Sequence, residues 1–258
     1  MCLDILCRVR EVLLLGVAAI AGAINSVAGG GTLVSFPTLI WLGVPSIPAN
    51  ATNAVALWPG SLGSVWGYRR EMRGLDTRVW ALVVPSVIGG ITGAVLLYRT
   101  PSDVFDRLVP VLILFATILF MVQEPLQRRF NLAPYHEARS HWLSWVMFFQ
   151  LLVGVYGGYF GAGIGILMLA ALSVMGHTDI HQMNGIKNVL AVAVNAVASA
   201  YFIVSGLVVW SDALVMAVGA VLGGIGGAGL ARRIGRTAVR RIVVVIGFAM
   251  AVSLMLRL

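Results

Sequence analysis

The chain has 258 residues, of which 59% are hydrophobic and only 11% are charged, and its mean hydropathy is +0.94. Soluble domains carry about 25% charged residues, so this composition excludes an ordinary soluble protein. The formal net charge of +8 does not indicate a nucleic-acid partner, because most Lys and Arg residues lie in short segments between apolar runs, as they do in the cytoplasmic loops of membrane proteins.

Charged residues are absent from long segments of the sequence. An apolar run of about 18 residues is long enough to predict a transmembrane helix, and most of the charge-free runs reach that length. Because they show no strand-like alternation, we predict an all-α polytopic protein that crosses a membrane several times, with the lipid bilayer as its surroundings. The runs lie at 12–68, 79–98, 108–123, 140–178, 213–231 and 242–256.

The first half of the chain begins with the apolar element 12–28, which runs into three consecutive glycines, Gly29, Gly30 and Gly31. Glycine weakens a helix by roughly 1 kcal/mol per residue relative to alanine, so these glycines mark a break. A basic segment at 69–78 then separates the third element from the fourth. The remaining elements of this half are predicted at 32–42, 48–68, 79–98 and 105–122.

The longest polar stretch, 123–141, predicts a cytoplasmic linker between two domains, 1–122 and 142–258. The second domain opens with the apolar element 142–160, which is followed by a second break at Gly161, Ala162 and Gly163. Its later elements are predicted at 164–175, 182–204, 213–231 and 242–256.

The two halves resemble each other in sequence, which indicates an internal duplication. The glycine breaks superpose with an offset of 132, and the helix after each break aligns with an offset of 135, which places Asn53 on Asn188. Further along, IGGITGA at 88–94 matches LGGIGGA at 222–228. Three matches in the same order predict two structural repeats.

The arginine clusters lie at non-equivalent positions of these repeats. Four arginines occupy 69–78 in the first repeat, whereas five occupy 232–241, one helix later, in the second. If both clusters are cytoplasmic, as the positive-inside rule requires, equivalent helices run in opposite directions and the repeats are inverted. Arg8 and Arg10 then fall on the outer side, against that rule.

The length of the broken elements limits how they can enter the membrane. The piece 32–42 has 11 residues, or about 16 Å of helix, and cannot cross a hydrocarbon core of about 30 Å. We therefore predict that each repeat consists of a glycine-broken helical hairpin, which enters and leaves on the same side, and three transmembrane helices. Five tilted crossings in each half remain an alternative, because both arrangements preserve sidedness.

The glycine breaks predict an anion site. Non-helical backbone at membrane depth persists where it lines a cavity, a helix that starts there offers free N–H groups to an anion, and paired broken helices of inverted repeats hold the substrate of many secondary transporters. Close helix packing is the alternative role of glycine, and we prefer it at 88–94 and 222–228. The predicted binding residues are Asn25, Gly29, Gly30, Gly31, Thr32, Asn53, Tyr159, Gly161, Ala162, Gly163, Lys187 and Asn188.

Lys187 is the only formal charge between residues 180 and 211. An ionisable group at membrane depth indicates function, and a cation suits an anionic substrate; alternatively, its head group reaches the membrane surface. No Asp or Glu lies inside an apolar run, so a carboxylate proton relay is not evident. Because no nucleophile set, nucleotide motif or Cys/His metal spacing is present, we expect no enzymatic activity, no cofactor and no metal.

Four segments together resemble the TauE/SafE sulfite exporter family, also called the toluene-sulfonate uptake permeases. They are GAINSVAGGGTLVSFPTL and NATNAVALWPGSLGSVWGYRRE in the first half, and GVYGGYFGAGIGILML and NGIKNVLAVAVNAVASAYF in the second. The resemblance covers nearly the whole chain. It implies an inner-membrane secondary transporter, usually an exporter, of small sulfur-containing anions such as sulfite or organosulfonates.

The functional prediction is thus a transporter that moves a small sulfur oxyanion or organosulfonate by alternating access. An anion channel that uses the glycine breaks as its filter is the alternative. A structural subunit of a larger complex is a third reading. Flux measurements separate the three, because a channel would carry currents far above the turnover of a carrier and a structural subunit would carry no flux.

Overall fold

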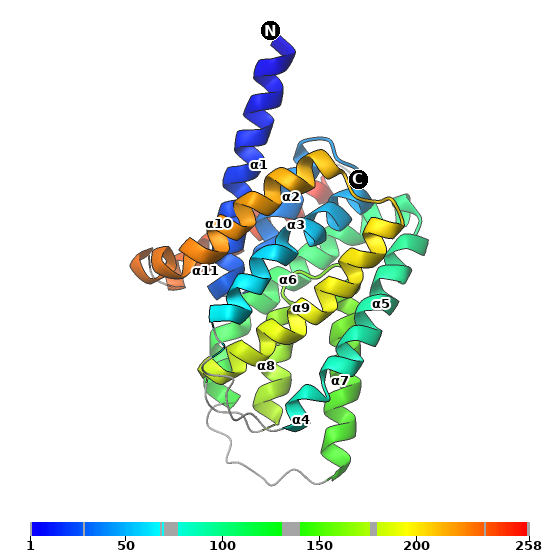
Figure 1. The fold of residues 1–258 in the computed structure, drawn as a ribbon, viewed down its shortest axis with the longest axis vertical. Coiled ribbons are helices and arrows are strands. Elements are labelled where there is room, and N and C mark those ends of the chain that lie inside the picture. The colour runs from blue at the N-terminus through cyan, green and yellow to red at the C-terminus, as the bar shows by residue number, and fades with distance from the viewer. Residues whose placement is uncertain are drawn as a thin grey trace.

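The computed structural model describes residues 2–27, 29–67, 69, 77–130, 140–175, 180–234 and 236–256. Every regular element in these segments is a helix (Figure 1), which confirms the all-α prediction. Residues 70–76, with two of the four arginines of the first cluster, lie outside the described residues, as does the middle of the predicted linker at 131–139.

The helices of the first half extend beyond several predicted apolar runs. The first helix begins ten residues earlier than the run that starts at 12, and the sixth continues into 123–130, because good helix formers such as Leu, Arg, Glu and Gln continue these segments outside the apolar region. In chain order the helices are α1 (Cys2–Val27), α2 (Thr32–Trp41), α3 (Ser46–Gly67), the single turn α4 (Thr77–Trp80), α5 (Val83–Arg99) and α6 (Ser102–Phe130).

The second half has a matching order of helices, two of which flank the second glycine segment. They are α7 (Ser140–Tyr159), α8 (Ile164–Val174), α9 (Ile180–Val204), α10 (Trp210–Ile234) and α11 (Arg236–Met255). Among the described residues, Ser102–Val122 of α6 and Gln182–Val204 of α9 are long and apolar enough to cross a membrane by length and composition, whereas α2, α5, α8 and parts of α7, α10 and α11 are shorter apolar helices.

Helices of the two halves pack against each other in matching pairs. α1 packs along α10, and α7 packs along α5. α3 contacts α10 as α9 contacts α5, while α3 contacts α9 and α6 contacts α11. These pairs match when α1 is exchanged for α7, α3 for α9, and α5 for α10.

Glycines allow the two most extensive helix pairs to approach closely. A Cβ atom at Gly93 of α5 would overlap the carbonyl oxygen of Val155 in α7, and one at Gly223 of α10 would overlap that of Ala19 in α1. Small residues at such positions let helix backbones come together in membranes. These contacts agree with the packing role preferred for the glycines at 88–94 and 222–228. The surroundings of Gly227, in the second of these stretches, lie outside the described residues.

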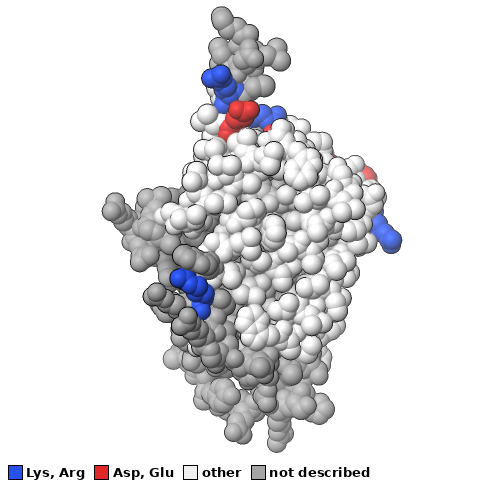
Figure 2. Space-filling model, viewed as in Figure 1, with Lys and Arg blue, Asp and Glu red and all other residues white. Residues whose placement is uncertain are grey.

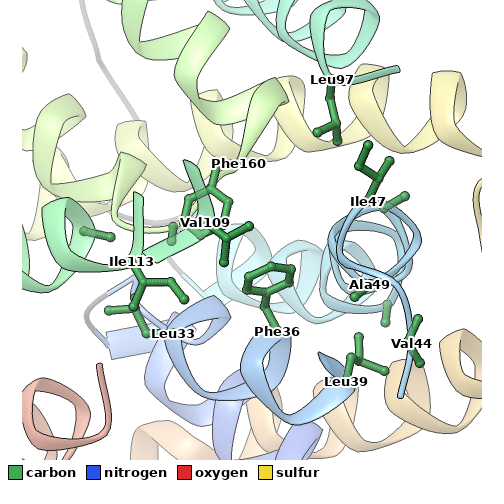
Figure 3. Close-up of a cluster of buried hydrophobic side chains, with 14 of the residues drawn as sticks. Leu33, Phe36, Leu39, Val44, Ile47, Ala49, Leu97, Val109, Ile113 and Phe160 are labelled. Atoms are coloured by element: carbon green, nitrogen blue, oxygen red, sulfur yellow. The ribbon is translucent and has the colours of Figure 1, made fainter. Parts of the chain in front are cut away.

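The main hydrophobic core surrounds α2, which lies inside the bundle (Figure 3). Phe36 of α2 is fully buried and meets the ring of Phe160 edge-on, with ring centroids 5.4 Å apart. Leu33 and Leu39, on either side of Phe36, belong to the same cluster. This packing ties the short helix of the first half to the glycine segment of the second.

The outer surface of the bundle is apolar and carries few charges. Large side chains such as Leu96, Val111, Phe148 and Leu222 are exposed around its circumference. Figure 2 shows an uncharged middle, with the described charged residues at the margins of the view. An apolar belt of this kind suits contact with lipid acyl chains.

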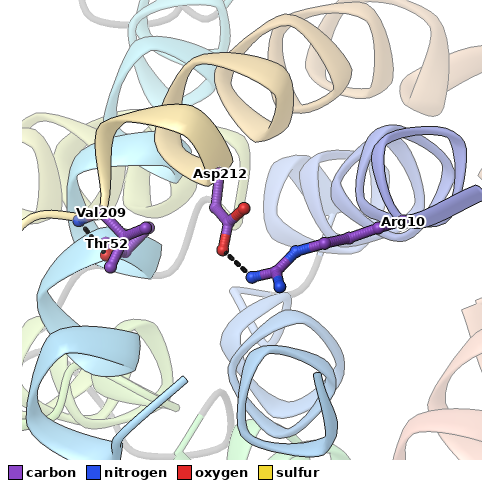
Figure 4. Close-up of polar contacts among 4 residues, drawn as sticks. All are labelled: Arg10, Thr52, Val209 and Asp212. Atoms are coloured by element: carbon purple, nitrogen blue, oxygen red, sulfur yellow. Dashed lines mark hydrogen bonds and ion pairs between the residues drawn. The ribbon is translucent and has the colours of Figure 1, made fainter. Parts of the chain in front are cut away.

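An ion pair joins α1 to α10 (Figure 4). Nη2 of Arg10 lies 2.6 Å from Oδ2 of Asp212, which is only 4% exposed. Beside it, the backbone N–H of Val209 donates to the hydroxyl of Thr52 at 3.0 Å. The pair gives Arg10 a local partner, which accounts for an arginine at this end of the molecule.

The start of α1 and the end of α2 lie at the same end of the bundle. This end holds Asp212 and is here called the Asp212 end. Arg10 near the start of α1 contacts Asp212. Thr52, in the first turns of α3, which follows α2, accepts a hydrogen bond from Val209, three residues before Asp212. Figure 1 shows the start of α7 and the end of α8 at the opposite end, towards α4.

Candidate functional site

A cavity of about 50 Å³ lies between the two glycine breaks, residues 29–31 and 161–163, which are here called the glycine segments. Six helices from both halves form its wall. α3 and α9, which contact each other, supply most of its side chains. Its polar side chains are Asn25, Thr32, Asn50, Asn53, Ser61, Lys187, Asn188 and Asn195, and its glycines are Gly29, Gly157, Gly158, Gly161 and Gly165.

The glycine segments end their helices by the same local geometry. Gly29 has φ +77° and Gly161 has φ +80°, a left-handed conformation that costs glycine little. The N–H of each glycine reaches back to the carbonyl oxygen five residues earlier, Ile24 at 3.3 Å and Tyr156 at 3.2 Å. Such bonds close the C-terminus of a helix, so α1 and α7 both stop where the cavity begins.

The two segments touch each other at the cavity. A Cβ atom built on Gly29 would lie 3.7 Å from Cα of Gly165, at the start of α8. The helices that restart there, α2 after Gly31 and α8 after Gly163, have no side-chain cap. The first N–H groups of a helix carry a partial positive charge, and this charge favours an anion close by.

The structure brings seven of the twelve predicted residues to the cavity wall and five to other positions. Gly30 packs beneath the ring of Phe120, and a Cβ at Gly31 would overlap the carbonyl oxygen of Ala21. The seven are Asn25, Gly29, Thr32, Asn53, Gly161, Lys187 and Asn188; the five are Gly30, Gly31, Tyr159, Ala162 and Gly163.

The other predicted residues of the second segment support the wall from behind through their backbone. The carbonyl oxygen of Tyr159 accepts a hydrogen bond from Nδ2 of Asn50 at 2.9 Å, and that of Ala162 accepts one from the hydroxyl of Tyr156 at 2.7 Å. Gly163 has φ +79° and lies against Ala116 of α6. These bonds satisfy the carbonyl groups of Tyr159, the last residue of α7, and of Ala162, in the segment between α7 and α8.

Lys187 is buried, with 2% of its surface exposed, which excludes the alternative that its head group reaches the surface. Its aliphatic stem lies against Gly165, where an added Cβ would come 3.0 Å from Cδ. No Asp or Glu lines the cavity among the described residues. Among the described residues, the cavity wall therefore has a cationic side chain and no acidic one.

Hydrogen bonds orient two of the asparagines on α3 and leave one on α9 unpaired. Oδ1 of Asn53 accepts a hydrogen bond from the hydroxyl of Ser35, so the amide nitrogen is the end of Asn53 that this bond does not use. Nδ2 of Asn50 donates a hydrogen bond to the carbonyl oxygen of Tyr159. Asn188 is 6% exposed, and its Nδ2 has no hydrogen-bond partner among the described residues.

Asn50, Ser61 and Asn195 line the cavity although they were not among the predicted binding residues. The spacing on α3 could have indicated two of them, because Asn50, Asn53 and Ser61 lie on one face of that helix, at intervals of three and eight residues. Gly157 and Gly158 of α7 also reach the wall, and nothing in their sequence separates them from glycines that serve packing.

The described residues hold no group of three or more His, Cys, Asp or Glu side chains that could bind a metal. The donors that face the cavity are amide nitrogens, hydroxyls and one ammonium group. Such a set can hold oxygen atoms that carry negative charge.

Comparison with known proteins identifies relatives along almost the entire chain. The family model described as "Sulfite exporter TauE/SafE" matches residues 14–254. A "Probable membrane transporter protein" of Haemophilus influenzae is 28% identical over 243 residues, covering 92% of this chain and 91% of the relative. The Escherichia coli K12 "Probable membrane transporter protein YfcA" is 27% identical over 248 residues, covering 94% and 90%. No solved structure matches the chain.

Proposed function

Because the chain belongs to the sulfite exporter TauE/SafE family and is a membrane transporter of that family, we propose that it carries a small sulfur-containing anion out of the cell by alternating access. The observation that carries the proposal is the cavity between the two glycine segments, which combines buried amide donors with Lys187 and holds no acidic side chain among the described residues. Its membrane is the inner membrane of the cell.

The proposal includes two inverted repeats, and the arrangement of the helices supports them. The helix pairs match when α1, α3 and α5 are exchanged for α7, α9 and α10. α1 starts at the Asp212 end, whereas α7 starts at the opposite end (Figure 1). An axis in the membrane plane would relate two such halves, and inverted repeats of this kind place a site at their interface.

The same arrangement supports re-entrant hairpins. α2 has 10 residues and α8 has 11, or about 15–17 Å of helix, which is half of a hydrocarbon core. Each short helix returns from the cavity towards the end at which its preceding helix began. The cavity then lies near the midplane and opens to one side at a time as the two repeats move relative to each other.

The proposal is tested with purified protein in proteoliposomes. We expect saturable flux of labelled sulfite that is inhibited by an excess of unlabelled sulfite, with taurine, sulfoacetate and sulfate compared as competitors. Ionic currents should stay at the level of carrier turnover. If no sulfur-containing anion moves faster than in empty liposomes, the substrate class is wrong; if large ionic currents accompany the flux, the protein is a channel.

A further inference from the structure

The face of α9 that lines the cavity carries a further polar residue. Four wall residues of this helix follow one another at intervals of three, four and seven, which places them on one helical face; they are Asn188, Ala191, Asn195 and Phe202. Ser199 follows Asn195 by four residues and precedes Phe202 by three, so it lies on the same face. Ser199 is nevertheless not part of the wall in this structure.

The hydroxyl of Ser199 is buried without a partner. Ser199 is 3% exposed, and its Oγ has no hydrogen-bond partner among the described residues. A helical hydroxyl can donate to the carbonyl oxygen four residues earlier, as those of Ser86, Thr117 and Ser173 do here at 2.7, 2.7 and 2.9 Å. Because an unsatisfied buried polar group costs stability, a hydroxyl that does not form this local bond indicates a partner from outside the chain.

Phe202 is the wall residue nearest to Ser199 along α9. An aromatic side chain on a helix leans towards the N-terminus, over the residues three and four positions earlier, which accounts for a wall that contains Phe202 and not Ser199. Phe202 is 1% exposed and belongs to the same hydrophobic cluster as Phe36 and Phe160. Displacement of its ring would therefore join the space beside Ser199 to the cavity.

This part of α9 leads towards the Asp212 end of the bundle. α9 ends at Val204, two residues after Phe202. The connection that follows contains Val209, which bonds to Thr52 and lies three residues before Asp212. The sequence of residues from Asn195 to Phe202 thus runs from the cavity towards that end.

From the helical register, the unpaired hydroxyl and the position of Phe202, we infer that the transported ligand passes between the cavity and the Asp212 end along this face of α9. Ser199 donates a hydrogen bond to the ligand on this route, and Phe202 closes the route in this structure. The ligand is a solute with acceptor atoms, such as the proposed anion. The inference rests on the proposed function for that anion, but access to Ser199 can be measured without it.

The experiment measures the reactivity of single cysteines, in a chain without Cys2 and Cys7, towards the membrane-impermeant reagent sulfonatoethyl methanethiosulfonate. The protein is in proteoliposomes, and the reagent is added to one side at a time. Ser211→Cys marks the side of the Asp212 end, since Ser211 is exposed and adjacent to Asp212. Ser86→Cys is the matched control, because Ser86 is also buried but its hydroxyl is bonded and does not line the cavity.

We expect Ser199→Cys to react from the same side as Ser211→Cys and at least about tenfold faster than Ser86→Cys, because a thiol that stays buried is inert. Addition of Phe202→Leu should raise the rate at position 199 by about threefold or more, since the smaller side chain leaves space beside it. A cysteine at position 199 that reacts no faster than the one at position 86, with and without Phe202→Leu, would overturn the inference. Reaction only from the side opposite to Ser211→Cys would also overturn it.

The contact with the ligand is tested by Ser199→Ala, which should lower sulfite flux at limiting concentration by about tenfold without lowering the unfolding temperature, because only the ligand loses a hydrogen bond. Ser173→Ala is the control, since the Ser173 hydroxyl is bonded to Leu169 away from the cavity; its flux should stay unchanged. Unchanged flux of Ser199→Ala would show that the hydroxyl does not contact the ligand. Labelling at position 199 without flux of any sulfur anion would keep the route and remove the proposed substrate.

Discussion

Lys187 and Gly165 share one small space at the start of α8. Cδ of the lysine lies only 3.0 Å from the position of a Cβ at residue 165, so the glycine allows the buried lysine to lie beside the glycine segments. Burying an ammonium group is costly, and the anion that we propose for the cavity would offset part of that cost. The geometry of the cavity wall at this point thus depends on the absence of a side chain at Gly165 as well as on the charge of Lys187.

Gly165→Ala should lower the transport rate by about tenfold, because a Cβ at 3.0 Å from Cδ of Lys187 must displace the lysine and over-packing of this kind costs about 1–3 kcal/mol. The measurement is sulfite flux at saturating and limiting concentrations. Gly16→Ala is the control, since no atom lies within 4 Å of a Cβ at that position. Equal flux of the two variants would show that Gly165 does not set the position of Lys187.

At the scale of elements, α10 and α1 form a unit whose backbones are in direct contact. Gly219 and Gly223 of α10 face the carbonyl oxygens of Leu15 and Ala19, and the Arg10–Asp212 pair closes the same interface at its end. α5 and α7 form the corresponding unit through Gly89 and Gly93. These two units flank the pair α3 and α9, which supplies most of the side chains of the cavity.

Substitutions at two glycines of α10 should change stability in opposite directions. Gly223→Ala should lower the unfolding temperature in detergent, because its Cβ would overlap Ala19 and cost about 1–3 kcal/mol. Gly226→Ala has no atom within 4 Å of its Cβ and should raise the temperature slightly, since alanine favours a helix over glycine by up to about 1 kcal/mol. Equal unfolding temperatures would contradict the packing described for α1 and α10.

At the scale of the whole molecule, the proposed inverted repeats predict opposite locations for equivalent helix ends. α6 starts at Ser102 and its counterpart α11 starts at Arg236. Single cysteines at these positions, in a chain without Cys2 and Cys7, should react with a membrane-impermeant maleimide from opposite sides of the membrane, and the one at position 236 should react from the cytoplasm. Labelling of both from the same side would mean that the repeats are not inverted.

Much of the helical framework could be predicted from the sequence, because it depends on local composition. The glycine runs interrupt long apolar segments, and α1 ends at Val27 and α2 begins at Thr32, within one residue of the expected limits of 28 and 32. Helix ends outside the apolar runs were less predictable, since neither charge nor hydropathy marks where a backbone stops. This is why α1 and α6 are longer than expected.

The composition of the cavity wall was harder to predict because it depends on contacts between distant segments. Asn50 and Tyr159 are 109 residues apart, and no local pattern shows that the amide of one satisfies the carbonyl of the other. Glycines gave a further ambiguity: Gly29 and Gly31 look alike in sequence, yet Gly29 lines the cavity while Gly31 packs against Ala21. Asp212 likewise lies at the edge of an apolar run, and only its pairing with Arg10 explains its burial.

We propose that a sulfur-containing anion is carried through the cavity beside Lys187. The most direct measurement compares sulfite flux of the wild-type protein and of Lys187→Ala in proteoliposomes of equal protein content, with Trp58→Phe as a variant outside the cavity wall. We predict saturable flux for the wild type and for Trp58→Phe, and at least about tenfold lower flux at limiting sulfite for Lys187→Ala, since it removes the charge that balances the anion. Flux of Lys187→Ala with unchanged affinity and rate would show that Lys187 takes no part in carrying the anion.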